Sequence, residues 1–220
     1  MNIIEALEDG KVLAPALGET PETWRAWLVY LRALFGLPLE NPVDLALYRQ
    51  NTGREKPPTS RAIESWVVSG RRSGKSWVAA VVAVFLALFE DDRWKRRHVK
   101  GELLLLPVIS ADRAQSRVVF RYISAILEAS PLLSPLVERQ GADFIELANG
   151  VRIEIRTASF RSIRGYKLLG AVLDEVGFWF DEMGGRNPAR EIVAALRPAI
   201  EPSGLLVAIS SAGSRDGLLF

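Results

Sequence analysis

The chain has 220 residues, of which 49% are hydrophobic and 25% are charged. This composition is typical of a globular protein with a sizeable core, and it excludes a disordered chain. The chain contains no cysteine and only one histidine, His98, which excludes disulfides, thiolate metal sites and a cysteine nucleophile. Its net charge is only +2, so an anionic partner would have to be bound by local clusters of basic residues.

The sequence carries no signal for a membrane or for secretion. Its longest apolar stretch, residues 77–89, is too short to span a bilayer. The first ten residues contain acids and lack the basic region of a secretory signal. We therefore expect a cytoplasmic protein with no membrane partner.

Residues 1–60 are expected to form a helical N-terminal extension and a linker. A Thr-Pro start signal and apolar residues at helical spacing predict a helix over residues 20–36. A second start signal, Asn-Pro, predicts another helix over about residues 41–50. Residues 51–60, rich in proline and polar residues, indicate a linker.

From residue 61 to residue 220 the pattern changes to alternating strands and helices. Buried strands are expected at 65–69, 103–109, 168–173 and 205–210, helices at 75–89, 111–129 and 187–198, and a hairpin over 143–157 with Asn149-Gly150 as its turn. Apolar strands that alternate with helices predict an α/β fold, with a mostly parallel central sheet flanked by helices.

A phosphate-binding loop is the first motif with a chemical meaning. Residues 69–76 read SGRRSGKS, which matches the P-loop template except that Ser69 takes the place of the first glycine. In such a loop backbone amides and a helix N-terminus bind phosphate, Lys75 neutralises the β- and γ-phosphates, and Ser76 binds Mg²⁺. A chance Gly-Lys-Ser at a helix start is the alternative. The expected phosphate-binding residues are Gly70, Arg71, Arg72, Ser73, Gly74, Lys75 and Ser76.

Two adjacent acids end the apolar stretch LLGAVLDE, residues 168–175. At the carboxyl edge of a parallel sheet, Asp174 could hold Mg²⁺, and Glu175 could orient and deprotonate an attacking water. A solvated strand end is the alternative for this pair alone. Together with the loop about 100 residues upstream, in one α/β pattern, the acids predict a nucleoside triphosphatase.

Beyond these motifs, the chain resembles the ATPase domain of the large terminase subunit of tailed bacteriophages, the motor that pumps DNA into a preformed capsid. The resemblance covers roughly residues 45–220 and implies a P-loop NTPase of the additional-strand, RecA-like type. The similar segments are GRRSGKS (70–76), SADRAQSRVVFRYI (110–123), FIELANGVRIEIRTAS (144–159), SIRGYKLLGAVLDEVGFW (162–179), NPAREIVAALRPAI (187–200) and LLVAISSAGSRDGLLF (205–220).

The resemblance implies roles for further residues. Ser210 and Ser211 match the segment that couples hydrolysis to movement, although this chain has Ser-Ala-Gly at 211–213 where many relatives have Ser-Thr-Pro or Ser-Ser-Pro. Gln50 is a candidate for the glutamine that contacts adenine, with a solvated helix end as the alternative. Arg164 and Arg71 compete for the arginine finger, Arg164 from a neighbouring subunit and Arg71 within its own site. We favour Arg164.

Other basic and aromatic residues allow two interpretations each. Arg113, Arg117 and Arg121 recur every four residues, so they share a helix face that could line a DNA channel, contact a subunit or simply be solvated. Residues 93–100 could contact a phosphate backbone, with a solvated loop favoured. Trp24 and Trp27 are interpreted as core of the helical extension and not as a base-stacking platform.

The resemblance also implies the cofactor, partners and domain content. ATP would be hydrolysed with Mg²⁺ to translocate double-stranded DNA into a procapsid, in the cytoplasm of an infected bacterium. The partners would be a homo-oligomeric ring, expected to be a pentamer on the portal, the portal protein and the small terminase subunit. The family's nuclease domain follows the ATPase, and we expect neither that domain nor nuclease activity in this chain, which ends at Phe220.

Two other functions stay open at this stage. One is a helicase- or recombinase-like DNA-dependent ATPase with the same core. The other is a catalytically silent module that binds nucleotide or serves in assembly. Turnover that requires duplex and not single-stranded DNA would separate the first from a packaging motor, and binding without turnover at any protein concentration would favour the second.

Overall fold

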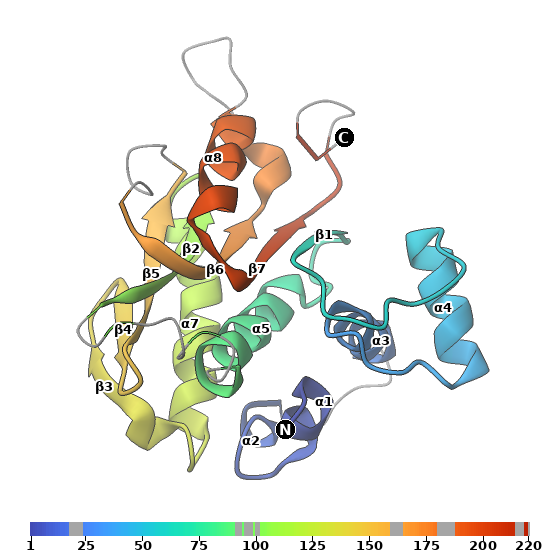
Figure 1. Ribbon diagram of the computed structural model, residues 1–220, viewed down its shortest axis with the longest axis horizontal. Coiled ribbons are helices and arrows are strands. Elements are labelled where there is room, and N and C mark those ends of the chain that lie inside the picture. The colour runs from blue at the N-terminus through green and yellow to red at the C-terminus, as the bar shows by residue number, and fades with distance from the viewer. Residues whose placement is uncertain are drawn as a thin grey trace.

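The computed structural model describes residues 1–17, 24–90, 94, 99, 102–158, 165–179, 188–213 and 218–219. At its centre is a seven-stranded sheet with the strand order β1-β7-β6-β2-β5-β4-β3 and helices on both faces (Figure 1). The strands are β1 (Glu64–Val68), β2 (Leu104–Ser110), β3 (Val137–Gln140), β4 (Phe144–Leu147), β5 (Val151–Thr157), β6 (Lys167–Asp174) and β7 (Ile200–Ser210).

The five neighbouring strands β1, β7, β6, β2 and β5 are parallel to one another. β4 and β3 are added antiparallel at the β5 edge. The mostly parallel α/β sheet predicted from the sequence is thereby confirmed. β7 lies between β1, which leads into the expected phosphate loop, and β6, which ends in the acid pair. This extra strand between the two motif-bearing strands is the feature expected of the additional-strand type.

The helices cover the sheet unequally. They are α1 (Ile3–Glu8), α2 (Ala14–Leu17), α3 (Arg25–Leu34), α4 (Pro42–Thr52), α5 (Lys75–Phe89), α7 (Arg113–Ala129) and α8 (Pro188–Leu196). α5 and α7 pack side by side on one face, and α8 covers the other (Figure 1). Within the described residues, none of these helices is both long and apolar enough to cross a membrane.

Strand β2 shows how the sheet divides the core. Its side chains alternate between the faces, as they must in an extended strand. Leu104 and Leu106 join the larger cluster with α5 and α7, whereas Leu105 and Ile109 join the smaller cluster with α8. All seven residues of β2 are buried, because both faces of a parallel sheet are covered by helices.

The helical extension packs against the same core as α5. Buried side chains of α1 and α3 belong to the larger cluster, and Phe35 meets Phe85 of α5 edge-on with ring centroids 5.1 Å apart. α4 begins as predicted at an Asn-Pro signal, where the Asn41 side chain accepts a hydrogen bond from the Val43 amide. The expected start at residues 20–21 lies outside the described residues.

Most predicted elements are confirmed within a few residues. The hairpin turns at Gly150 with a φ of 87°, which glycine adopts without strain, and the helix expected over 75–89 spans those residues. Two features were not predicted. β7 begins at Ile200, earlier than expected, and the short strand β3 pairs with β4 although most of its side chains are exposed.

Candidate functional site

The candidate site lies where three parallel strands end at the same edge of the sheet. β1 runs into the loop over residues 69–74, β6 ends at Asp174 and β7 ends at Ser210. The Ser69 amide donates to the Ser210 carbonyl over 3.0 Å, which ties the start of the loop to the end of β7. Ligands of open α/β sheets bind at this carboxyl edge.

Ser69, which stands where the P-loop template has its first glycine, forms a side-chain hydrogen bond across the loop. The hydroxyls of Ser69 and Ser73 are hydrogen-bonded at 2.8 Å, which closes the loop across its width. Gly74 and Arg72 both have left-handed backbones, with φ of 88° and 61°. Glycine adopts this conformation freely, but for an arginine it is uncommon and marks a tightly constrained turn.

Lys75 is the buried cation of the site. Only 8% of its side chain is exposed. Its Nζ lies 3.1 Å from Glu175 Oε1 and donates to the Ser211 hydroxyl over 2.9 Å. The structure therefore brings together residues from the loop, from the end of β6 and from the end of β7, as predicted for the first two. The contact with Ser211 was not predicted.

Glu175 is held by three different residues. Its Oε2 accepts from the Ser211 amide over 2.6 Å and from the Ser210 hydroxyl over 3.3 Å, and its Oε1 accepts from the Ser211 hydroxyl over 3.0 Å. Burial raises the pKa of Glu175, but the bonds from Ser211 and Lys75 outweigh it and leave that pKa below the usual value. The residue is therefore ionised. Its backbone is left-handed, with a φ of 51°.

Asp174 is buried in a different way. It is 2% exposed, and its Oδ1 has no hydrogen-bond partner within the described residues. Burial and the neighbouring Glu175 raise its pKa to about 7, against the attraction of Lys75. Its backbone carbonyl accepts from the indole of Trp179 over 3.0 Å, which fixes the end of β6. A buried carboxyl oxygen without a partner suits a cation.

The residues present fit a magnesium ion bound together with phosphates. Asp174 offers the unpartnered oxygen, and Ser76 offers a hydroxyl in the first turn of α5. The described residues contain no group of three or more acidic or histidine side chains that could enclose a metal by themselves. Mg²⁺ is commonly held by one or two protein oxygens, with water and substrate phosphates completing its shell.

The structure does not test the roles predicted for several other residues. Arg71 and Arg72 are exposed on the loop, and Arg164 lies outside the described residues. Gln50 is exposed on α4 and its side chain makes no hydrogen bond with a described residue, so its adenine role stays a prediction. Residues 93–100 lie outside the described residues, except Trp94 and Val99.

The arginine face of α7 is exposed, as its spacing predicted. Arg113 and Arg117 both form ion pairs with Asp143, at 3.2 and 3.3 Å. Arg117 and Arg121 also line a pocket of about 380 Å³ between α7 and the turn after β3. These contacts agree with a solvated face, and they leave its partners untested.

Trp24 and Trp27 pack as predicted, but they also contact the loop. Both are partly buried against the larger cluster. The Trp27 indole donates to the carbonyl of Ser73 over 2.6 Å, and both rings lie beside Gly74. No sequence signal distinguishes Trp27 from an ordinary core residue, because its partner lies 46 positions away.

Comparison with solved structures identifies the fold. The chain is similar to the large terminase of bacteriophage HK97, with a TM-score of 0.54 and 18% identity over 90% of this chain and 39% of that chain. It is also similar to the large terminase ATPase domain of Thermus phage P74-26, with a TM-score of 0.50 and 18% identity over 85% of this chain and 70% of that one. The chain has the fold of phage large-terminase ATPase domains.

The similarity to the HK97 large terminase covers only part of that protein. The chain spans 39% of the length of the HK97 large terminase. No protein-family model matches it, and neither does any curated protein. The comparisons with solved structures therefore establish the fold of the chain.

Proposed function

We propose that the chain is the ATPase motor domain of a phage genome-packaging terminase, which hydrolyses ATP with Mg²⁺ to translocate double-stranded DNA. One observation carries this proposal: Lys75, Asp174, Glu175 and Ser211 converge at the carboxyl edge of the sheet, beside a constrained loop. A buried lysine and two acids in this arrangement are the parts that phosphoryl transfer from a nucleoside triphosphate requires.

The contacts around Glu175 suggest how nucleotide would prepare the site. In the structure, Lys75 bonds to Glu175 and Ser211. Phosphates bound in the loop would compete for the Lys75 ammonium, since they carry more negative charge than one carboxylate. Loss of this pair would free an oxygen of Glu175 to accept a proton from water.

Hydrolysis would then proceed by attack of water on the γ-phosphate. The water oxygen bonds to the γ-phosphorus, the bond from that phosphorus to the bridging oxygen breaks, and ADP leaves as its conjugate base. The water proton passes to Glu175. Mg²⁺ held by Ser76 and Asp174 would offset the charge of the phosphates. An arginine, Arg164 from a neighbour or Arg71 in the same chain, would stabilise the charge of the transition state.

Ser210 and Ser211 are suited to couple the site to the rest of the molecule. Both bond to Glu175, and the Ser210 hydroxyl also accepts from the Gly177 amide over 3.2 Å. A movement of the Glu175 side chain would therefore alter hydrogen bonds at the end of β7 and in the turn after β6. This arrangement supports the coupling role proposed for both serines.

The proposed partners follow from the packaging role. They are double-stranded DNA, further copies of the chain in a ring, with a pentamer proposed on the portal, the portal protein and the small terminase subunit. The proposed location is the cytoplasm of the infected bacterium. Adenine contact by Gln50 remains part of this proposal.

One observation favours a second candidate. Glu175 is already bonded by Lys75 and both serines, so a form that binds nucleotide without turning it over would need only to keep these bonds. Such a silent module would bind ATP at any protein concentration and release no phosphate.

ATP hydrolysis measured against protein concentration, with Mg²⁺ and with duplex or single-stranded DNA, tests the proposal. We expect turnover that rises more steeply than linearly with concentration and is stimulated by duplex DNA. Stimulation by single strands alone would instead indicate a helicase-like ATPase. Binding without turnover in every condition would indicate the silent module.

A further inference from the structure

Helix α3 of the N-terminal extension contacts the phosphate loop and the strand before it. Trp27 donates its indole N–H to the Ser73 carbonyl over 2.6 Å. One turn later, the Tyr30 hydroxyl lies 3.1 Å from the Ser65 hydroxyl of β1. The two aromatic rings meet edge-on, with centroids 5.7 Å apart. A single helix face therefore makes polar contacts on both sides of the turn from β1 into the loop.

Trp24 extends this contact to the first turn of α5. Its ring meets Trp77 edge-on, with centroids 4.5 Å apart. Atoms of Trp24 and Trp27 would lie 3.6 Å from a β-carbon placed at Gly74, which is ordinary van der Waals contact. The loop residue next to Lys75 thus packs against the rings of Trp24 and Trp27.

The bond to Ser73 fixes the orientation of one peptide group. In a trans peptide the carbonyl of one residue and the amide of the next point in opposite directions. Since Trp27 binds the Ser73 carbonyl from the α3 side, the Gly74 amide points away from α3. Phosphate binding by a P-loop depends on such amides, so the orientation of this peptide affects the ligand directly.

We propose that Trp27 is a positioning residue of the nucleotide site, which holds the Ser73–Gly74 peptide in the orientation that binds phosphate. The helical extension is then part of the binding site and not only an attachment to it. This inference rests on the proposed function, since it concerns the loop that would bind ATP. Trp27 acts through the backbone of Ser73 and needs no contact with the nucleotide.

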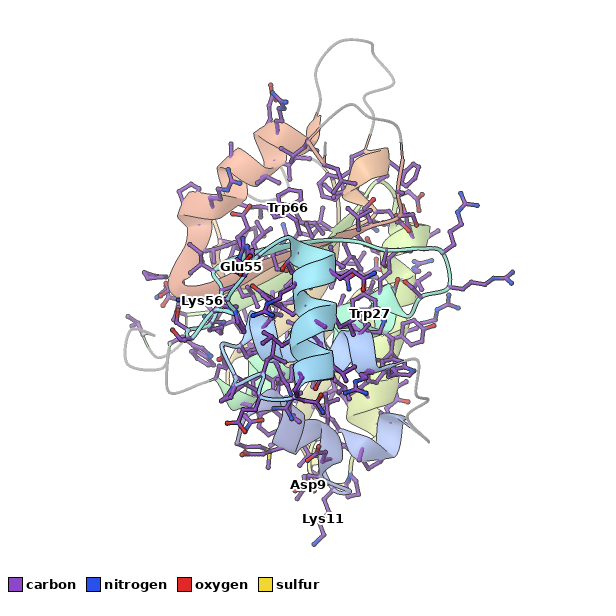
Figure 2. The ribbon with its side chains drawn as sticks, turned by 90° about the vertical axis from the view of Figure 1, so that its right-hand side faces the viewer. Asp9, Lys11, Trp27, Glu55, Lys56 and Trp66 are labelled. Atoms are coloured by element: carbon purple, nitrogen blue, oxygen red, sulfur yellow. The ribbon has the colours of Figure 1, made fainter. Side chains whose placement is uncertain are left out.

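Trp66 provides a matched control. It is also partly buried, and its indole donates to Glu64 Oε1 over 2.6 Å. It lies on β1 but packs with the smaller cluster under α8, on the opposite face of the sheet from Trp27. Figure 2 shows the two labelled side chains apart, with Trp66 nearer to α8. Trp66 therefore shares the chemistry of Trp27 but not its contact with the loop.

The test compares Trp27→Phe with Trp66→Phe in two measurements on the whole chain. Hydrogen exchange of the amides in residues 70–76 should be faster in Trp27→Phe and unchanged in Trp66→Phe. The Kd for ADP should rise about 3- to 10-fold in Trp27→Phe, the value of one neutral hydrogen bond. KM for ATP should rise by the same factor with kcat within about 2-fold, because the loop binds ground state and transition state alike.

Different outcomes separate the inference from the proposed function. Equal exchange and equal Kd in both variants would overturn the role of Trp27, while binding by the unaltered chain would still support the function. If the unaltered chain binds neither ADP nor ATP, the proposed function fails, and exchange of residues 70–76 still tests whether Trp27 holds the loop. If Trp27→Phe does not fold, 3-benzothienylalanine at position 27 replaces only the N–H by sulfur and gives the same test.

Discussion

The two halves of the sheet place their charged residues in contrasting ways. At the carboxyl edge of the parallel half, Lys75 and Asp174 are buried, and one oxygen of Asp174 has no partner in the described structure. On the antiparallel half, here β3, β4 and the strand β5 that pairs antiparallel with β4, Glu146 and Glu154 each pair with arginines at 2.7 to 3.1 Å. The first half carries buried charges, of which Asp174 is incompletely paired, whereas the second carries partly exposed charges that are paired.

This contrast separates charges that cost the fold stability from charges that do not. A buried charge without a full set of partners costs stability, so its presence needs a reason outside the fold. Paired charges near the surface contribute at most about 1 kcal/mol each and have little effect on either stability or reaction. The parallel half is therefore the part where substitutions should change activity most.

The largest effect should come from a residue that completes the site. Arg164→Ala should lower turnover by about 10³-fold, the value of an arginine finger, and leave ATP affinity nearly intact. Mixing this variant with Glu175→Gln should restore turnover if the arginine acts across a subunit boundary, because each variant then supplies what the other lacks. A mixture that stays inactive, while Arg71→Ala alone abolishes hydrolysis, would assign the finger to Arg71.

Glu175→Gln should give the next largest effect. The amide keeps the shape of the side chain but cannot accept a proton, so turnover should fall by about 100-fold or more. ATP should still bind, because Lys75 loses a competitor for the phosphates. Phosphate release and equilibrium binding measured on one preparation check both statements, and unchanged turnover would exclude Glu175 as the base.

Asp174→Asn should raise thermal stability in the absence of metal. The pKa of Asp174 is raised to about 7, so its contribution to stability is present at low pH and is lost as the pH rises from about 4 through 7. At pH 8 the variant removes a buried charge, and we expect its Tm to exceed that of the unaltered chain by roughly 3 °C. At pH 5.5, midway through this range, the difference should be about half as large, and near pH 4 it should disappear. A lower Tm at pH 8 would contradict the account of this carboxyl group.

Glu154→Gln should have the smallest effect and completes the comparison. Its carboxylate pairs with Arg152 at 2.7 Å and Arg156 at 3.1 Å and is 20% exposed. We expect a change in the free energy of unfolding of at most about 1 kcal/mol, measured with urea, and no change in turnover. A loss of turnover would show that the antiparallel half also contributes to the reaction.

The sequence predicted those features that depend on neighbouring residues. The Gly74-Lys75-Ser76 triplet marks the start of α5, and the acid pair marks the end of β6, because each signal is local. Asn149-Gly150 likewise predicts a turn that the structure contains. These local rules were sufficient for the α/β fold and for placing the loop and the acid pair at the ends of their strands.

The features that escaped prediction depend on distant residues. Lys75 meets Ser211 across 136 positions, and Trp27 meets Ser73 across 46. The hydroxyl pair of Ser69 and Ser73 explains a departure from the loop template only once the loop is folded. Such contacts are set by how β1, β6 and β7 are ordered in the sheet, which no local pattern reveals.

Whether Lys75 is part of a nucleotide site is tested by equilibrium binding of ATP with Mg²⁺. The binding is measured for the unaltered chain, Lys75→Ala and Lys167→Ala. Lys167 lies at the opposite end of β6, where it pairs with Glu102 and Glu201 at 3.2 and 3.3 Å. We expect Lys75→Ala to lose most nucleotide affinity, by about 10-fold or more, since a charge-assisted contact to phosphate is removed. Lys167→Ala should bind within about 2-fold of the unaltered chain. Equal affinity in all three proteins would contradict a nucleotide site at Lys75.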